Sequence, residues 1–197
     1  MIRMVKLAVA ATALAGLAAC GGGSTGSGAL SFQQIGNRAD PLITRFENVS
    51  STPIRNVPTS GSANYSGIMA AEADVGGEVT ALAGLANMRV GFGSNTLSGS
   101  ITNIVNDANQ RYPGRLNMTN GTIDRSGGNS LFPGEVVMET DVTGRLTGPA
   151  GERIVVDGGS VLGFGNPNYE VIGGLIGGDL TVDGTRGSFF GGLVLER

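Results

Sequence analysis

The stretch VVMETDVTGRL, residues 136–146, alternates apolar and polar side chains with a period of two residues. Successive side chains of a strand point to opposite faces, so this period predicts a β-strand with one buried face. The apolar face carries Val136, Met138, Val142 and Leu146, and the polar face carries Glu139, Asp141, Thr143 and Arg145.

The same period recurs along the chain from residue 63 onward. Leu82, Met88 and Phe92 share one face of the run 81–92, and Ile172 and Ile176 share one face of the run 172–182. Turn residues such as Pro113-Gly114 and Asp183-Gly184 separate the runs. We therefore predict eight strands, near residues 63–72, 81–92, 96–105, 115–125, 134–147, 152–164, 169–182 and 188–197.

Short loops favour sequential hairpins, and eight tilted strands in a meander can close on themselves and remove both sheet edges. The predicted fold is therefore all-β, a single eight-stranded antiparallel up-and-down barrel over residues 63–197. Glycine inside a strand costs stability unless it allows a bend or a close approach, and a small closed barrel needs both. The glycines inside predicted strands include Gly67, Gly99, Gly144, Gly158, Gly174, Gly178 and Gly191.

The interior of an eight-stranded barrel is filled by side chains or holds one small ligand. Large apolar candidates for inward positions, such as Leu82, Met88 and Phe92, favour a packed core over a ligand cavity.

Residues 30–62 are interpreted as an irregular segment with one short helix. Asp40 can cap a helix that begins at Pro41, and Leu42, Ile43 and Phe46 then share a face. Two later prolines return the chain to irregular structure.

Residues 1–19 are interpreted as a lipoprotein signal peptide. Basic residues precede an uncharged apolar stretch at 7–17, which is too short to span a bilayer as a helix. The residues Leu17-Ala18-Ala19-Cys20 then match the bacterial lipobox, so Cys20 is the expected lipidation site, with palmitate-type acyl chains that anchor the chain in a membrane. A plain export signal with an incidental thiol is the alternative, although no second cysteine exists to pair with it.

The expected location is the outer membrane, because Gly21 stands where inner-membrane lipoproteins of the enteric type carry aspartate. Residues 20–29 are rich in glycine and serine and are expected to form a flexible tether between the acylated cysteine and the barrel. Lipoprotein processing and export machinery are expected partners, and display on the cell surface or towards the periplasm stays open.

Composition limits the chemistry. Removing residues 1–19 removes Arg3 and Lys6 from the 13 basic residues and none of the 16 acidic ones, which leaves eleven basic residues and a net charge near −5. Without a basic stripe, nucleic acid and anionic lipid surfaces are not expected partners. The chain has no histidine, and its only lysine and only thiol lie within residues 1–20. We therefore expect no enzyme, no cofactor and no metal site.

Three motifs resemble the barrel domain of the transferrin-binding protein B-like lipoproteins over residues 60–197. Tyr65-Ser66-Gly67 is similar to an opening strand of that family, residues 92–101 to its second hairpin, and residues 187–191, Gly-Ser-Phe-Phe-Gly, to its closing strand. The resemblance implies an outer-membrane lipoprotein barrel, and some such proteins bind host proteins or haem. The chain has one predicted barrel rather than two lobes, so transferrin binding is not carried over and no ligand-binding residue is assigned.

The leading functional hypothesis is a non-enzymatic binding module for an extracellular protein or a haem-type ligand. Loops at 106–114 and 122–133 are the expected contact regions, because recognition concentrates on loops of rigid scaffolds. Two alternatives remain: a structural envelope lipoprotein, and a periplasmic protease inhibitor that inserts residues 30–62 into an active site. Closure of the barrel predicts a monomer.

Overall fold

The computed structural model describes residues 30–127, 129, 134–165 and 168–197. The predicted signal peptide, the tether and Cys20 lie outside these residues. Within the described part, no helix is long and apolar enough to cross a membrane.

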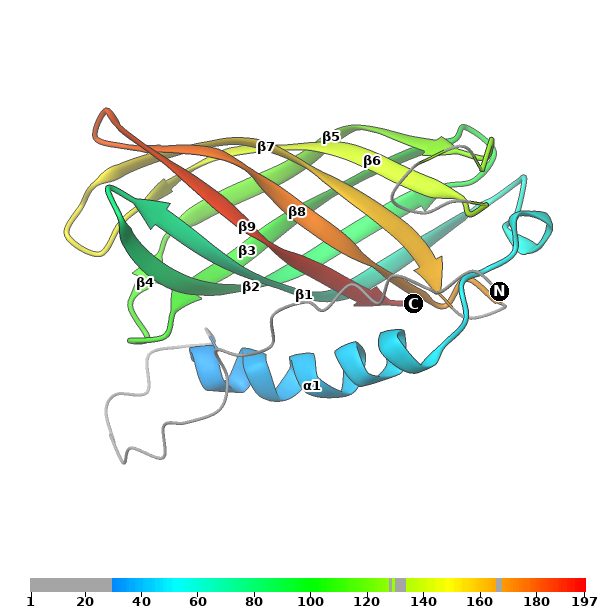
Figure 1. Cartoon of the computed structure of the whole chain (residues 1–197), viewed down its shortest axis with the longest axis horizontal. Helices are drawn as coiled ribbons and strands as arrows, with labels where there is room; N and C mark the ends of the chain where they lie inside the picture. The colour runs from blue at the N-terminus through cyan, green and yellow to red at the C-terminus, as the bar shows by residue number, and fades with distance from the viewer. Residues whose placement is uncertain (1–29, 128, 130–133, 166–167) are drawn as a thin grey trace.

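Eight long antiparallel strands close into a barrel (Figure 1). Each of them pairs with its neighbour in sequence, and the last strand pairs with the first, so the sheet has no free edge along its main body. The predicted up-and-down barrel is therefore confirmed. The strands are β1 (Ser62–Val75), β2 (Glu78–Gly91), β3 (Thr96–Asn106), β4 (Arg111–Tyr112), β5 (Gly114–Asp124), β6 (Val137–Thr147), β7 (Arg153–Gly165), β8 (Val171–Val182) and β9 (Thr185–Glu196), of which β4 is a short addition to β3.

The first hairpin is longer than predicted. β1 and β2 run to Val75 and from Glu78, and only Gly76 and Gly77 separate them. Both glycines have positive φ, +64° and +87°, as a tight two-residue hairpin turn requires. The sequence prediction ended the first strand early because the charged residues near this turn weaken the apolar alternation.

The helix α1 (Phe32–Asn48) begins a full two turns before Pro41, the predicted start. Ser31 caps it: its hydroxyl accepts the N–H of Gln34 at 3.1 Å, while the Gln34 side chain accepts the N–H of Ser31 at 2.9 Å. This capping box replaces the predicted cap at Asp40, and Pro41 lies inside the helix rather than at its first position. Pro41 removes one backbone hydrogen bond, and the helix persists because tertiary contacts stabilise it on both sides of the proline.

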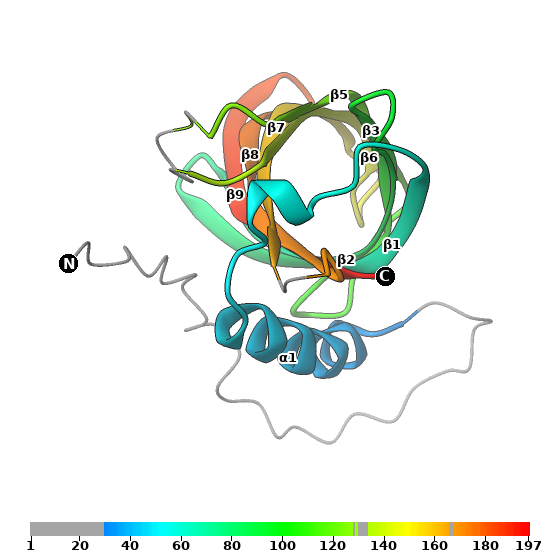
Figure 2. The same cartoon turned by 90° about the vertical axis from the view of Figure 1, so that its right-hand side faces the viewer.

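Those contacts are with the outer wall of the barrel. Ile35 and Ala39 are buried in one apolar cluster with Ile68, Ala83 and Val105. Farther along the helix, the Phe46 ring packs so closely on Gly173 that a Cβ there would lie 2.6 Å from it. Residues 30–62 were predicted to be irregular with one short helix; the helix instead takes up 32–48 and docks beneath the barrel, and the rest of the segment is irregular apart from a short 3-10 turn (Figures 1 and 2).

The glycines inside the strands allow close approach of neighbouring backbones. At each of the seven positions named from the sequence, a methyl group in place of the glycine hydrogen would collide with the backbone of an adjacent strand; Gly67, for example, faces the carbonyl of Val194. This finding confirms the sequence interpretation, because a small barrel coils tightly where glycine removes the side chain.

Candidate ligand-binding site at the open end of the barrel

The two ends of the barrel are built differently. We call the end with the β2–β3 and β7–β8 connections the plugged end, and the end with the β1–β2, β6–β7 and β8–β9 turns the open end. At the plugged end, the Phe92 ring lies 6.1 Å from the Phe164 ring and 5.4 Å from the Tyr169 ring. The Tyr65 hydroxyl donates to the Tyr169 carbonyl at 2.7 Å, and these rings fill the interior.

A segment before β1 completes the plug. The 3-10 turn η2 (Ile54–Asn56) lies across the barrel opening in Figure 2, and the following Val57 is only 3% exposed. The Arg125 guanidinium donates to the carbonyls of Val57 and Pro58, at 3.3 and 2.7 Å, and so holds the segment in place. Access to the interior from this end is blocked.

At the open end the interior contains a cavity of about 270 Å³. Every long strand contributes at least one residue to its lining, and β1 and β2 contribute several each. The walls of the cavity are apolar. The space is not filled by side chains because the β1 residues that face it are small. The apolar wall consists of Met69, Ala71, Ala73, Leu82, Ile104, Leu116, Leu146, Ile154, Val156, Leu180 and Phe189.

The charged side chains at the rim of this cavity are acidic. Glu78 and Glu152 are the charged residues of its lining, and no arginine is among the lining residues. Tyr112 stands beside them, and the Asn106 amide lies 3.4 Å from its hydroxyl. Burial raises the pKa of Tyr112, the Asn106 hydrogen bond lowers it, and the carboxylates of Glu152, Asp107 and Glu78 raise it further. Acidic side chains therefore surround the phenol at the cavity opening.

The sequence prediction of a packed core is correct for the plugged end and wrong for the open end. Phe92 and Met88 are buried in the filled half, whereas Leu82 lines the cavity. Alternation identifies Ala71 and Ala73 as inward positions, and their small size was the available signal for a cavity. The alternation alone could not show it, because the strand register decides which side chains share a layer.

The two loops expected to form a contact surface lie at opposite ends. The connection at 106–114 lies at the open end, where it contains β4, because β3 ends there and β5 starts there. The connection after Asp124 lies at the plugged end, and residues 128 and 130–133 of it lie outside the described residues. These loops therefore cannot form one joint contact surface. Cys20, the predicted lipidation site, also lies outside the described residues.

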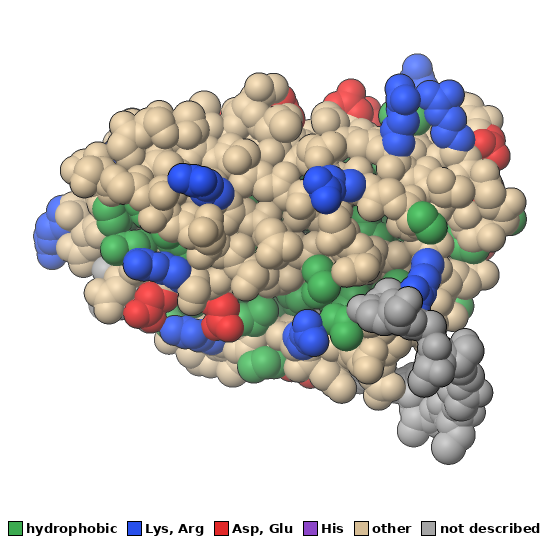
Figure 3. All heavy atoms as spheres, turned by 180° about the vertical axis from the view of Figure 1, so that it is seen from behind, with side chains coloured by type: hydrophobic (Ala, Val, Ile, Leu, Met, Phe, Trp, Pro, Cys, Tyr) green, Lys and Arg blue, Asp and Glu red, His purple; other side chains and the backbone are tan. Residues whose placement is uncertain are grey.

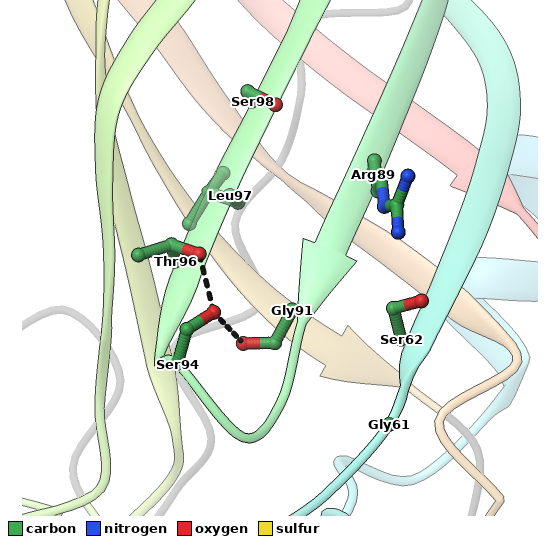
Figure 4. Close-up of a pocket in the computed structure, with 8 residues that line it drawn as sticks. All are labelled: Gly61, Ser62, Arg89, Gly91, Ser94, Thr96, Leu97 and Ser98. Carbon is green, nitrogen blue, oxygen red and sulfur yellow. Dashed lines mark hydrogen bonds between the residues drawn. The ribbon is translucent and has the colours of Figure 1, made fainter.

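A second hollow lies on the outer surface near the β2–β3 connection (Figure 4). It is larger, at about 510 Å³, but exposed residues including Ser62, Arg89 and Ser98 line it, and it has no enclosed apolar floor. The Ser94 hydroxyl already bonds to the Thr96 hydroxyl at 2.7 Å and to the Gly91 carbonyl at 3.3 Å. We regard the apolar cavity inside the barrel as the better candidate site, because ligand sites are concave and mostly apolar.

No group of three or more histidine, cysteine, aspartate or glutamate side chains is placed to hold a metal ion in the part of the chain that the structure describes. What the cavity can do chemically is remove apolar surface from water, with two carboxylates and a phenol at its opening.

The comparisons with known proteins concern architecture. No family model and no curated protein matches the sequence. Among solved structures, a double mutant of the vaccine antigen transferrin binding protein B from Haemophilus parasuis Hp5 is 18% identical, with a TM-score of 0.46, over 75% of this chain and 28% of that chain. A single mutant of the same antigen is 19% identical, with a TM-score of 0.45, over 75% and 29%.

Intact Ap-TbpB, with its N and C lobes, is 17% identical, with a TM-score of 0.45, over 74% of this chain and 28% of that chain. The chain thus spans less than a third of the length of these proteins, which belong to the group that its sequence motifs resemble. We carry no residue role over from them, and the barrel itself is established by its strand pairing.

Proposed function

We propose that the protein is an outer-membrane lipoprotein, anchored through Cys20, whose barrel binds a small apolar ligand at its open end without converting it chemically. The observation that carries this proposal is the cup shape of the interior, which is filled at one end and hollow and apolar at the other. A barrel that only braced other envelope proteins would not need an unfilled half, since an empty cavity costs stability.

The cavity limits the ligand by size and charge. Its volume of about 270 Å³ lies just below the range of roughly 300–1,000 Å³ that is usual for drug-sized ligands, so it suits one short apolar chain or a small ring system. The carboxylates of Glu78 and Glu152 favour a ligand whose polar end is neutral or cationic. Haem, with its anionic propionates, matches this rim less well than such a ligand.

The docked position of residues 30–62 weakens the protease-inhibitor hypothesis. That hypothesis requires the segment to be free for insertion, whereas Ile35, Ala39 and Val57 are buried against the barrel. A structural envelope role without a ligand is the alternative that a binding experiment must exclude.

The test is binding of the neutral fluorescent probe N-phenyl-1-naphthylamine to the lipid-free protein, Cys20→Ser without residues 1–19. Because the chain has no tryptophan, protein emission does not interfere with the probe. Ala73→Leu fills the cavity from β1 and should weaken binding at least tenfold. Val79→Leu, on a side chain that is 59% exposed and outside the lining, is the matched control and should bind as the parent does.

Two results would contradict the proposal. One is a parent protein that does not enhance probe fluorescence, and the other is equal affinity in Ala73→Leu and Val79→Leu. Thermal melting of both variants checks that each barrel is folded.

A further inference from the structure

The strand register brings three arginines together at the rim of the open end. Arg115 near the start of β5 lies directly opposite Arg145 near the end of β6. Arg153 starts β7 and pairs with Thr147, two residues beyond Arg145. All three are exposed on the outer wall, and basic side chains gather at this end of the barrel in Figure 3. We call these residues the arginine triad.

Two carboxylates lie near this triad without forming an ion pair with it in the described structure: Asp183, which accepts the backbone N–H of Arg153, and Asp157, the next outward residue of β7 after Val155. Like charges directly opposite each other on neighbouring strands are destabilising. Arg45 forms ion pairs with Glu170 and Glu196, at the other end of the barrel from the triad. The nearest outward positions on the same strands are uncharged: Asn117, Thr143, Thr147 and Val155.

Several acidic residues of the open end make local hydrogen bonds to backbone groups. Asp74 accepts the N–H of Gly77 at 2.9 Å, and Asp183 accepts the backbone N–H of Arg153 at 2.9 Å. Glu152 accepts the N–H of Ala150 at 2.9 Å, and Glu78 lines the cavity. The guanidinium groups of the triad are therefore available to an anionic partner outside the chain.

The start of α1 is held at the same end of the barrel. The backbone N–H of Phe32 donates to the Asn109 side chain at 2.9 Å, in the β3–β4 connection of the open end. Leu30 lies ten positions after Cys20, and ten residue steps reach at most about 35 Å when fully extended. The barrel is roughly 30 Å tall, as tilted strands of about twelve residues are. An anchor at Cys20 therefore reaches the plugged end only when these ten residues are almost fully extended.

From these observations we propose that the open end is a membrane-facing surface on which Arg115, Arg145 and Arg153 bind phosphate groups of anionic lipids. Guanidinium groups match phosphate geometry and form charge-assisted hydrogen bonds with it. The triad lies on β5–β7, whereas α1 contacts β1, β2, β8 and β9, so the two lie on different sides of the barrel. Two attachments on different sides keep the barrel upright on the bilayer. One consequence rests on the proposed function: if the open end faces the bilayer, the apolar ligand enters the cavity from the membrane.

The first experiment measures binding of the lipid-free protein to vesicles of phosphatidylcholine with 30% phosphatidylglycerol at low salt. Arg115→Gln/Arg145→Gln should weaken binding about 30-fold, at roughly fivefold for each arginine near an anionic surface. The matched control is Arg55→Gln/Arg89→Gln, which removes the same charge from exposed residues near the plugged end and should change binding less than twofold. Equal losses in the two variants, or equal binding to pure phosphatidylcholine, would overturn the proposal.

The second experiment reports orientation in the acylated protein, where an introduced cysteine is the single free thiol. A fluorophore on Ala150→Cys, in the β6–β7 turn, should be quenched by headgroup-labelled lipid more strongly than one on Gly93→Cys, at the plugged end. Equal or stronger quenching at residue 93 would show that the open end does not face the bilayer. Probe binding without vesicles tests the cavity separately, so a failure of the membrane surface leaves the proposed ligand binding standing.

Discussion

The plugged end and the open end of this barrel are formed by the same eight strands, yet one half is solid and the other is hollow. At the plugged end, the rings of Phe92, Phe164 and Tyr169 meet in the centre. At the open end, the inward positions of β1 are Ala71 and Ala73, and the space between the walls stays empty.

This difference suggests that one end of the barrel serves stability and the other serves binding. The aromatic half supplies buried area and tertiary hydrogen bonds that stabilise the fold. The aliphatic half keeps a space that the chain could have filled with larger side chains, which is the reason to look for function there. Substitutions should therefore affect the two ends in different ways.

The largest effect is expected from truncating the plug. Phe92→Ala removes a ring that is 3% exposed, and we expect it to lower the free energy of unfolding by about 3–5 kcal/mol. The equivalent truncation at the open end, Leu82→Ala, affects a side chain that already borders the cavity and should cost about 1–2 kcal/mol. Urea denaturation of both variants measures the contrast. Equal losses would mean that the two ends are packed alike.

An intermediate effect is expected from alkaline pH. Burial raises the pKa of Tyr65 well above 10, so its neutral form is favoured in the folded state. Below pH 10 the hydroxyl is neutral in both states, and above it the unfolded chain ionises first. Stability should therefore fall by about 1.4 kcal/mol per pH unit for this group. Melting between pH 9 and pH 11 tests this.

Tyr65→Phe is the variant that sharpens this comparison. It should reduce the alkaline loss, although it also removes the hydrogen bond to Tyr169 and lowers stability at neutral pH by about 1 kcal/mol. Tyr112→Phe at the open end should reduce the alkaline loss less, because Tyr112 is less buried. An unchanged alkaline loss in Tyr65→Phe would refute the role of its burial.

The smallest effect is expected where α1 meets the plugged end. Arg45 bonds to Glu170 at 2.9 Å and to Glu196 at 2.8 Å, and all three side chains are about 40% exposed. Exposed ion pairs contribute little, so Arg45→Gln should cost less than about 1 kcal/mol, and the difference should shrink at high salt. A loss above about 2 kcal/mol would show that the helix contributes to closing this end.

The barrel was predictable from the sequence because alternation is a local property. Met138 and Val142 belong to the core wherever the strand lies, and Asp183-Gly184 marks a turn whatever surrounds it. The start of α1 was not predictable in the same way. Two caps compete, Ser31 with Gln34 and Asp40 with Pro41, and the contacts of Ile35 and Ala39 with the outer wall decide between them.

The candidate site and the arginine triad depend on register. Arg115 and Arg145 are thirty residues apart in sequence and directly opposite in the sheet. The sequence therefore showed no basic stripe, and anionic lipid surfaces were not expected. The cavity was not predictable for the same reason. Its position depends on which end of the barrel η2 covers, and that is decided by contacts between segments distant in sequence.

The pairing of β1 with β9 also determines when the molecule can fold. Ser66 lies opposite Glu196, so the seam joins residues separated by 130 positions. A chain that is synthesised from its N-terminus exposes two unpaired strand edges until the last strand is complete. Such long-range pairing is slow and leaves strand edges open to aggregation in the meantime. The barrel can therefore close only after the whole of β9 has been synthesised, so until then the chain exposes strand edges to chaperones and proteases.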